Sequence, residues 1–148
     1  MKKFKALLTA AIMLIATSAF VNNPEAVSLK VKEAFTSDFS KASKVSWEKT
    51  DEFYFASFEL GGARLEAAYD ETGRLLGTSR TILASQMPLN VTLSIAEKYA
   101  GYQLSVSALE LNLEGQTRYY VTVSNQKQVI QLKCLSNGDL EVEAKQKI

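Results

Sequence analysis

The sequence predicts an α+β fold made of two tandem units, each with one helix followed by a four-stranded antiparallel meander, and with the helices packed on one sheet face. The main observation is a repeat. At an offset of about 65 residues, Tyr54 falls on Tyr119 and Leu65 falls on Ile130, which is typical of one structural unit used twice. Turns too short for parallel neighbours, such as Gly61-Gly62, also separate the strand-like runs.

The start of the chain has the layout of a secretory signal peptide. A lysine-rich beginning precedes the uncharged apolar residues 6–16, and small residues follow as far as Ala19. The alternative is a membrane anchor, which needs about 20 apolar residues, whereas this run ends by Val21. We therefore expect cleavage of residues 1–19 and a mature protein that is periplasmic or secreted, with no membrane association after cleavage.

The mature chain divides at the dipeptide Met87-Pro88 into a first αββββ unit, residues 20–86, and a second αββββ unit, residues 87–148. The two units are expected to form one compact domain. Asn23 and Pro24 suit the N-cap and the first position of the first helix. Alternation predicts strands in the first unit over residues 45–49, 52–60, 63–69 and 74–82. The second unit is expected to have a helix over residues 89–100 and strands over 105–113, 117–124, 128–135 and 140–145.

Period-two alternation assigns the side chains of each sheet to two faces. The face expected under the helices carries Tyr54, Ala56, Phe58, Leu65, Ala67 and Tyr69 in the first unit, and Tyr119, Val121, Val123, Ile130, Leu132 and Cys134 in the second. Cys134 is the single cysteine, so no internal disulfide is possible. Its place on this face favours a buried apolar residue; an intermolecular disulfide and a reactive thiol are the alternatives.

The opposite sheet face carries the candidate binding residues. Phe53, Phe55 and Arg64 lie on it in the first unit, and Arg118 and Tyr120 lie on it in the second. Large aromatic side chains on a nominally solvent-facing surface mark either a binding surface or packing that the pattern does not reveal.

Trp47, the single tryptophan, shares a face of the first strand with Val45. It is either a core residue or a partly exposed anchor beside Phe53 and Phe55. Tryptophan is enriched among the residues that dominate binding energy at interfaces, which keeps the second interpretation open.

The composition argues against an enzyme. Histidine is absent, which removes the usual general base and the commonest metal ligand. The string Ser46-Trp47-Glu48-Lys49 matches the serine–lysine spacing of serine acyl enzymes, but it alternates like a strand, which turns Ser46 and Lys49 to opposite faces. We therefore expect no catalytic residue, no metal and no cofactor. The formal net charge of +1 gives no electrostatic reason to expect a nucleic-acid partner.

A set of core and turn residues resembles the PepSY-like exported proteins of Bacteroidetes-type bacteria, which are similar in fold to the β-lactamase-inhibitor-protein type of tandem αβ unit. These residues are Ala34-Phe35, Val45-Ser46-Trp47, Tyr54-Phe55-Ala56-Ser57-Phe58, Ala68-Tyr69, Gly73 and Met87-Pro88, after the leader. The resemblance extends over nearly all of the mature protein. It departs at Leu111, which stands at the position of Trp47 in the second unit, and at Met87-Pro88, where Leu-Pro is more usual. It implies a non-enzymatic exported binding module and supplies no catalytic residues.

The leading hypothesis is an exported, non-enzymatic module that binds a protein or peptide of the cell envelope through the open sheet face. The expected partner-binding residues are Trp47, Phe53, Phe55, Arg64, Arg118 and Tyr120. Inhibition of an envelope hydrolase is one form that this binding could take, on fold analogy alone. The alternative is a periplasmic small-molecule-binding protein with a pocket between sheet and helices, although the inward side chains are bulky enough to fill that space.

Overall fold

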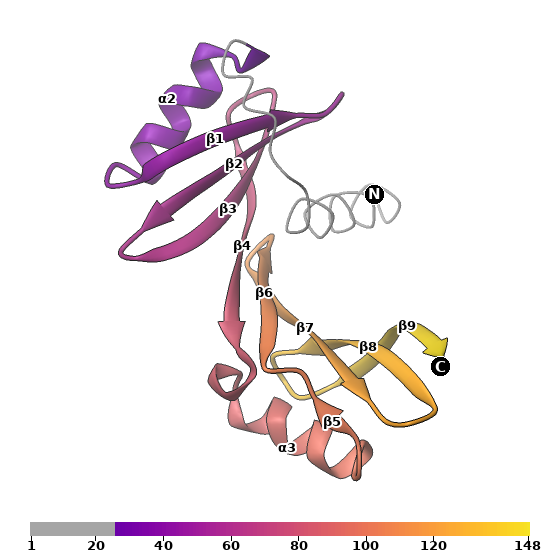
Figure 1. The fold of residues 1–148 in the computed structure, drawn as a ribbon. Coiled ribbons are helices and arrows are strands. Elements are labelled where there is room, and N and C mark those ends of the chain that lie inside the picture. Colours follow the sequence, from indigo (N-terminus) through magenta and orange to yellow (C-terminus); the bar gives the residue numbers. More distant parts are fainter. Residues whose placement is uncertain (1–25) are drawn as a thin grey trace. The chain divides into compact units, whose positions relative to one another are not determined.

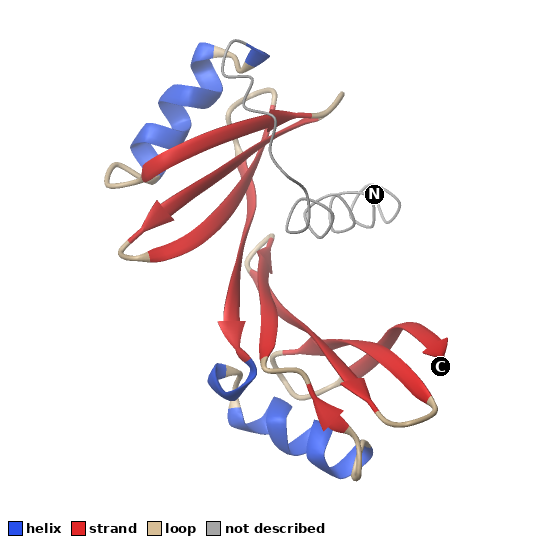
Figure 2. Cartoon of the chain, viewed as in Figure 1, coloured by secondary structure: helices blue, strands red, loops and turns tan. Residues whose placement is uncertain are grey.

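A computed structural model describes residues 26–148, so the expected signal peptide over residues 1–19 lies outside the described residues. This part of the protein forms two α-helices, one short 3-10 helix and nine strands (Figures 1 and 2). The helices are α2 (Leu29–Asp38), η2 (Ala84–Gln86) and α3 (Leu89–Lys98). The strands are β1 (Ser43–Lys49), β2 (Phe53–Leu60), β3 (Ala63–Asp70), β4 (Leu75–Leu83), β5 (Gln103–Leu104), β6 (Ser107–Leu113), β7 (Gln116–Ser124), β8 (Gln128–Leu135) and β9 (Leu140–Lys147).

The expected fold of two tandem helix-plus-four-strand units is wrong. The strands follow one path in the order β1-β2-β3-β4-β6-β7-β8-β9, and β5 pairs with β7 off this path. The class is therefore α+β with a large, mostly antiparallel sheet. The physical reason lies in β4, whose neighbours in the strand order are β3 on one side and β6 on the other, so the strands of both units belong to a single path. Its sequence contains no proline and no turn that would end the strand.

The protein nevertheless divides into two compact units, and the division falls inside β4. The first unit ends at Ser79 and the second begins at Arg80. The dipeptide Met87-Pro88 thus lies within the second unit, where Pro88 directly precedes α3.

In the first unit, α2 begins at Leu29 because Ser28 acts as its N-cap: the Ser28 hydroxyl oxygen accepts a hydrogen bond from the Val31 N–H at 3.3 Å. The expected start at Asn23 and Pro24 lies outside the described residues. The helix covers the sheet face predicted from alternation, and the core there is aromatic. Its buried members are Val27, Val31, Phe35, Trp47, Tyr54, Ala56, Phe58, Ala67 and Tyr69.

In the second unit, α3 covers the equivalent face of β7 and β8. The buried core contains Ile82, Ala84, Met87, Val91, Ile95, Ala108, Tyr119, Val121, Val123, Ile130, Leu132 and Cys134. The predicted helix-facing positions of both units are therefore confirmed. Cys134 is fully buried in this core, and burial raises the pKa of its thiol from 9.0 to about 11.

Corresponding residues of the two units do not keep a single offset. The pair Tyr54–Tyr69 of β2–β3 corresponds to Tyr119–Cys134 of β7–β8, as expected. In the first strand, Trp47 pairs with Ala56, and Ala56 corresponds to Val121. Since Leu109 pairs with Tyr120, the residue beside Val121 is Ala108, which is buried under α3. The counterpart of Trp47 is therefore Ala108, and the alignment of Trp47 with Leu111 is wrong.

Candidate functional site

The six residues expected to bind a partner do not form one exposed patch. Trp47 belongs to the core under α2, where it is 6% exposed. Its ring packs edge-on against Phe35 with a centroid distance of 5.2 Å, and it lies 6.4 Å from the ring of Tyr69. Of the two interpretations left open by the sequence, the structure shows Trp47 as a core residue.

Phe53 and Phe55 lie on the face of β2 that points away from α2, because they alternate with Tyr54 and Ala56 of the core. This face was expected to be open to solvent, but the two phenylalanines are 5% and 1% exposed. Their rings contact each other edge-on at a centroid distance of 6.3 Å. Alternation thus placed both side chains on the correct face, but it could not reveal that they are buried.

Arg64 is the exposed member of the set in the first unit. Its Nη2 donates a hydrogen bond to the buried Ser57 hydroxyl at 3.2 Å. Nearby, the Ser79 hydroxyl donates to Glu66 Oε2 at 3.3 Å. Burial raises the pKa of Glu66, and the bond from Ser79 and the charge of Arg64 reduce that effect. These four residues form a small polar cluster beside the buried phenylalanines.

Arg118 and Tyr120 lie two residues apart on β7 and share the sheet face opposite α3. Tyr120 is 4% exposed and pairs across the strands with Lys133 of β8. Lys133 Nζ lies 2.5 Å from Glu141 Oε2 and 3.9 Å from Glu143 Oε1, both on β9. We name these five residues, Arg118, Tyr120, Lys133, Glu141 and Glu143, the β7–β9 charge cluster.

The cluster surrounds the Tyr120 hydroxyl with charges of both signs. Burial is the largest cause of the raised pKa of Tyr120, and the negative charge of Glu143 adds to it. Arg118 acts in the opposite direction through its charge and a hydrogen bond to the hydroxyl. The hydroxyl therefore stays protonated and available for hydrogen bonding at neutral pH.

A β-bulge brings the second carboxylate into the cluster. The β8–β9 register shifts between Gln131, which pairs with Ala144, and Leu132, which pairs with Val142. Glu143 is the extra residue of this bulge, and bulges commonly redirect a side chain in this way. Lys133 shares a face with Tyr120 because the two residues pair directly across β7 and β8. No sequence signal marked the bulge, so the contribution of Glu143 was missed.

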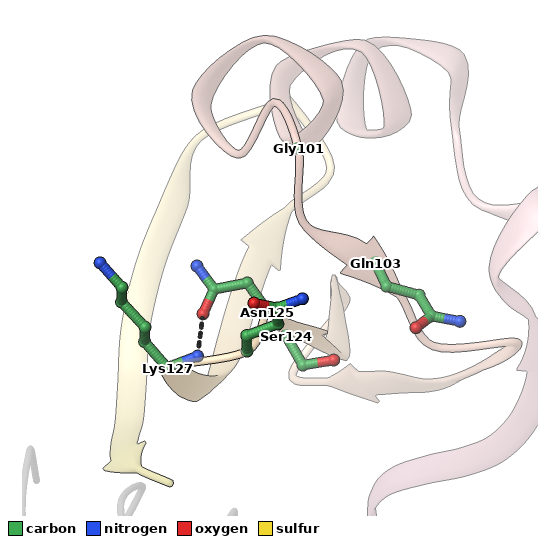
Figure 3. A pocket seen from close by; sticks show the side chains of 6 residues that line it. Gly101, Gln103, Ser124, Asn125 and Lys127 are labelled. Carbon is green, nitrogen blue, oxygen red and sulfur yellow. Dashed lines mark hydrogen bonds between the residues drawn. The ribbon is translucent and has the colours of Figure 1, made fainter.

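Open surface pockets also lie in the second unit, and two of them adjoin the ends of β7 and β8. The larger, of about 640 Å³, is lined by Gly101, Gln103, Ser124, Asn125, Gln126 and Lys127 (Figure 3). Its β7–β8 turn is fixed by Asn125 Oδ1, which accepts from the Lys127 N–H at 2.9 Å (Figure 3). The smaller pocket, of about 410 Å³, includes Arg118 and lies at the far ends of the same two strands.

The expected alternative site, a small-molecule pocket between sheet and helix, coincides with the filled cores described above. Val91 and Leu132, for example, are 0% exposed under α3, and Val31 and Tyr69 are 0% exposed under α2. Among residues 26–148 there is no group of three or more side chains placed to hold a metal ion. The helices formed by these residues are too short and too polar for any of them to cross a membrane.

Comparison with known proteins gives structural neighbours only: no family model matches the sequence, and no curated protein sequence matches it. A DUF2874 family protein from Bacteroides uniformis superposes with a TM-score of 0.68 at 17% identity, over 82% of this chain and 89% of that one. A BLIP-like protein from Bacteroides fragilis gives 0.64 at 22% identity, over 82% and 86%.

A third solved structure, provisionally described as periplasmic and from Bacteroides eggerthii, gives a TM-score of 0.67 at 16% identity, over 82% of this chain and 89% of that one. These likenesses agree with the expected resemblance to a BLIP-like fold of Bacteroidetes. The PepSY-like label receives no confirmation from them and stays a prediction. At such identities the comparison establishes the fold, and the fold of this protein is that of the BLIP-like and DUF2874 proteins of Bacteroides.

Proposed function

We propose that the protein is an exported, periplasmic or secreted binding protein without enzymatic activity. In this proposal it recognises another protein or a peptide through the sheet face opposite α3. The similarity to a BLIP-like protein and to a structure provisionally described as periplasmic supports the class of protein and its location. The β7–β9 charge cluster is the single observation that carries the choice of surface.

Two members of the cluster, Arg118 and Tyr120, are of residue types enriched at protein interfaces, and the other three, which are charged, can steer a partner. Tyrosine and arginine are the residue types that most often dominate binding energy, and charged side chains around them fix the orientation of a partner. The side chains of Glu141 and Glu143 are 52% and 40% exposed, so a partner can reach them, while Lys133 is 20% exposed and held between them. Tyr120 supports the charged side chains of the cluster through its hydrogen bond with Arg118.

The remaining predicted residues take different parts in this proposal. Arg64 is exposed and can orient a partner at the first unit. Trp47, Phe53 and Phe55 are buried, so they maintain the sheet that presents the charged side chains. This division replaces the aromatic anchors expected from the sequence with a charged recognition surface.

The test places a photo-crosslinking amino acid at Glu143, and at Glu97 on α3 as the matched control. Both positions are exposed glutamates of the second unit, and Glu97 lies on the helix that covers the other sheet face. After irradiation in an envelope extract, we expect a discrete crosslinked protein from position 143 only. The charge reversal Lys133→Glu in the same protein should abolish that product.

Equal products from both positions, or a product that survives Lys133→Glu, would discard this surface. Circular dichroism and the fluorescence of Trp47 check first that every variant is folded.

A further inference from the structure

The pocket that contains Arg118 is formed by a difference between the hairpins of the two units. In the first unit, the Thr50 N–H donates to the Phe53 carbonyl, and the turn lies directly beyond this pair. The corresponding pair in the second unit is Leu111 with Arg118, but there the ladder continues to Leu113 with Gln116. The turn itself follows at Glu114 and Gly115, whose φ angles are +53° and +76°. The second hairpin is therefore the longer one.

The longer hairpin leaves a notch beside β8. The β7–β8 ladder ends at Arg118 with Leu135, so the two preceding residues of β7, Gln116 and Thr117, have no β8 partner. After Leu135 the backbone turns away through Ser136 and Asn137. The resulting space is the pocket of about 410 Å³, lined by Gly115, Gln116, Thr117, Arg118, Leu135, Ser136 and Asn137. We name it the Arg118 notch.

Arg118 differs from the paired arginines of the protein. Arg74 Nε lies 3.1 Å from Asp70 Oδ2, and Arg80 Nε lies 2.6 Å from Glu110 Oε1. Within residues 26–148, Arg118 has no carboxylate in ion-pair distance; its partners are the neutral Gln116 Oε1, at 3.3 Å, and the Tyr120 hydroxyl. A guanidinium has five N–H donors, so Arg118 retains donors for an incoming acceptor.

Other donors line the same space. The Thr117 hydroxyl oxygen accepts from Asn112 Nδ2 at 3.4 Å, which leaves its own proton free to donate. The Ser136 hydroxyl forms no hydrogen bond in the described structure, although the Ser136 carbonyl accepts from Asn90 Nδ2. One arginine with two hydroxyl groups is a donor set that matches a carboxylate, whose two oxygens only accept.

The first unit offers an internal contrast at the corresponding place. Phe53 stands there for Arg118, and Asp70 stands for Leu135. Asp70 already accepts from the Thr72 N–H, the Thr72 hydroxyl, the Arg74 N–H and Arg74 Nε, at 2.6–3.1 Å. The carboxylate of Asp70 is thus bound within its own turn, whereas Leu135 supplies no carboxylate at the corresponding position, and Asp139 of that turn accepts from Asn137 Nδ2 at 2.8 Å.

We propose that the Arg118 notch binds a carboxylate of the partner protein, either that of an acidic side chain or that of the partner's carboxyl terminus. This inference rests on the proposed function and names the chemistry of the partner at one point of the surface. Arg118 binds the carboxylate through charge-assisted hydrogen bonds, and Thr117 and Ser136 donate to the same group. The exposed hairpin tip at Gly115 leaves the notch accessible from solvent.

The test is an NMR titration of the mature protein, followed through its backbone amide signals. Three probes are used: acetyl-Ala-Glu-Ala-amide, the same peptide with Gln for Glu, and acetyl-Ala-Ala with a free C-terminus. We expect saturable shifts at Gly115, Thr117 and Ser136 with the two carboxylate peptides, and the tighter of the two identifies the source. Arg118→Gln should weaken this binding at least about tenfold. Arg74→Gln, at an arginine already paired with Asp70, should leave it unchanged.

The inference is overturned by the absence of a saturable shift, by equal shifts with the Gln peptide, or by binding that persists in Arg118→Gln. Inorganic phosphate is the competing probe, and tighter binding of phosphate than of either carboxylate peptide would also overturn it. The crosslinking experiment at Glu143 can be repeated with Arg118→Gln. If the partner is still captured, the proposed function is retained, but the Arg118 notch takes no part in it.

Discussion

The Tyr69 hydroxyl donates a hydrogen bond of 2.8 Å to Asp38 Oδ2, which ties the last residue of α2 to the buried strand β3. Tyr69 is 0% exposed, whereas Asp38 is exposed, so the bond joins a core residue to a carboxylate at the surface. Burial and the nearby Asp38 charge both raise the pKa of Tyr69. The bond therefore fixes where the end of the helix sits on the sheet.

Removing the donor and removing the acceptor of this hydrogen bond should lower the free energy of unfolding by different amounts. Tyr69→Phe removes the donor and lets Asp38 bind water, so we expect a loss of about 1 kcal/mol in the free energy of unfolding. Asp38→Ala leaves the Tyr69 hydroxyl buried without an acceptor, so we expect about 2 kcal/mol. Urea unfolding followed by circular dichroism measures both. A smaller loss for Asp38→Ala than for Tyr69→Phe would contradict this account.

Trp47 should behave as a core residue in every measurement. Trp47→Ala opens a cavity among aromatic rings and should cost about 3–5 kcal/mol of unfolding free energy, whereas Trp47→Phe, which keeps an aromatic ring, should cost about 1–2 kcal/mol. Because Trp47 is the single tryptophan, the tryptophan fluorescence of the protein reports on this site alone. The emission should be blue-shifted and should resist quenching by iodide. Emission typical of solvent-exposed tryptophan in the folded protein would contradict the assignment of Trp47 to the core.

Gly73 and Gly62 distinguish two reasons why a position requires glycine, a positive φ angle and a close approach of neighbouring atoms. Their φ angles are nearly equal, +82° and +81°, but a Cβ at Gly73 would lie 3.2 Å from the Lys30 carbonyl oxygen of α2, and nothing lies within 4 Å at Gly62. Gly62→Ala should therefore cost about 1 kcal/mol from backbone strain alone. Gly73→Ala should cost at least about 2 kcal/mol, because the helix must also shift. Thermal unfolding compares the stability of the two variants. Equal losses of stability would show that the close approach of Gly73 to α2 does not add to the cost of the substitution.

The helix-facing half of the fold could be predicted because it depends on local alternation. Tyr54 and Tyr119 each sit in a strand whose every second residue is apolar, and such a strand has only one way to bury them against a helix. Cys134 could be assigned to the core by the same argument. No knowledge of the opposite sheet face was needed.

Three features lay beyond that argument. β4 has β3 as its neighbour on one side and β6 on the other, so the strands follow one path instead of two separate meanders; alternation identifies a strand without identifying its second neighbour. The counterpart of Trp47 is Ala108, because the hairpin between the first and second strands is longer in the second unit. Residues added in pairs leave the alternation of apolar positions unchanged, so the sequence pattern does not reveal the difference in hairpin length. Phe55 is buried although its face was expected to be open, because alternation assigns a face without showing what covers it.

The candidate site divides in the same way. Arg118, Tyr120 and Lys133 share a face by alternation, and this could be predicted. The approach of Glu143 to Lys133 depends on a bulge, and the Arg118 notch depends on where β8 stops relative to β7. Both are properties of strand register, which is set by pairing partners distant in the sequence.

The stability of the protein should decrease at alkaline pH, and Cys134 should account for the first part of that decrease. Its thiol is 0% exposed, and burial raises the pKa from 9.0 to about 11. Between these values the unfolded state releases a proton that the folded state retains, so the folded state loses stability as pH rises through this range. We expect full stability below about pH 9 and a loss of about 2 kcal/mol by pH 11 from this group.

Cys134→Ala tests the assignment, because it removes the titrating group while keeping a small apolar residue. It should lower stability below about pH 9, where only the packing loss counts, and flatten the dependence between about pH 9 and 10, before tyrosines ionise in the unfolded state. The loss above that range should remain, because the pKa values of Tyr69, Tyr119 and Tyr120 are also raised. Urea unfolding at a series of pH values gives both slopes. If the variant and the parent protein have the same slope from pH 9 to 10, Cys134 does not control this transition.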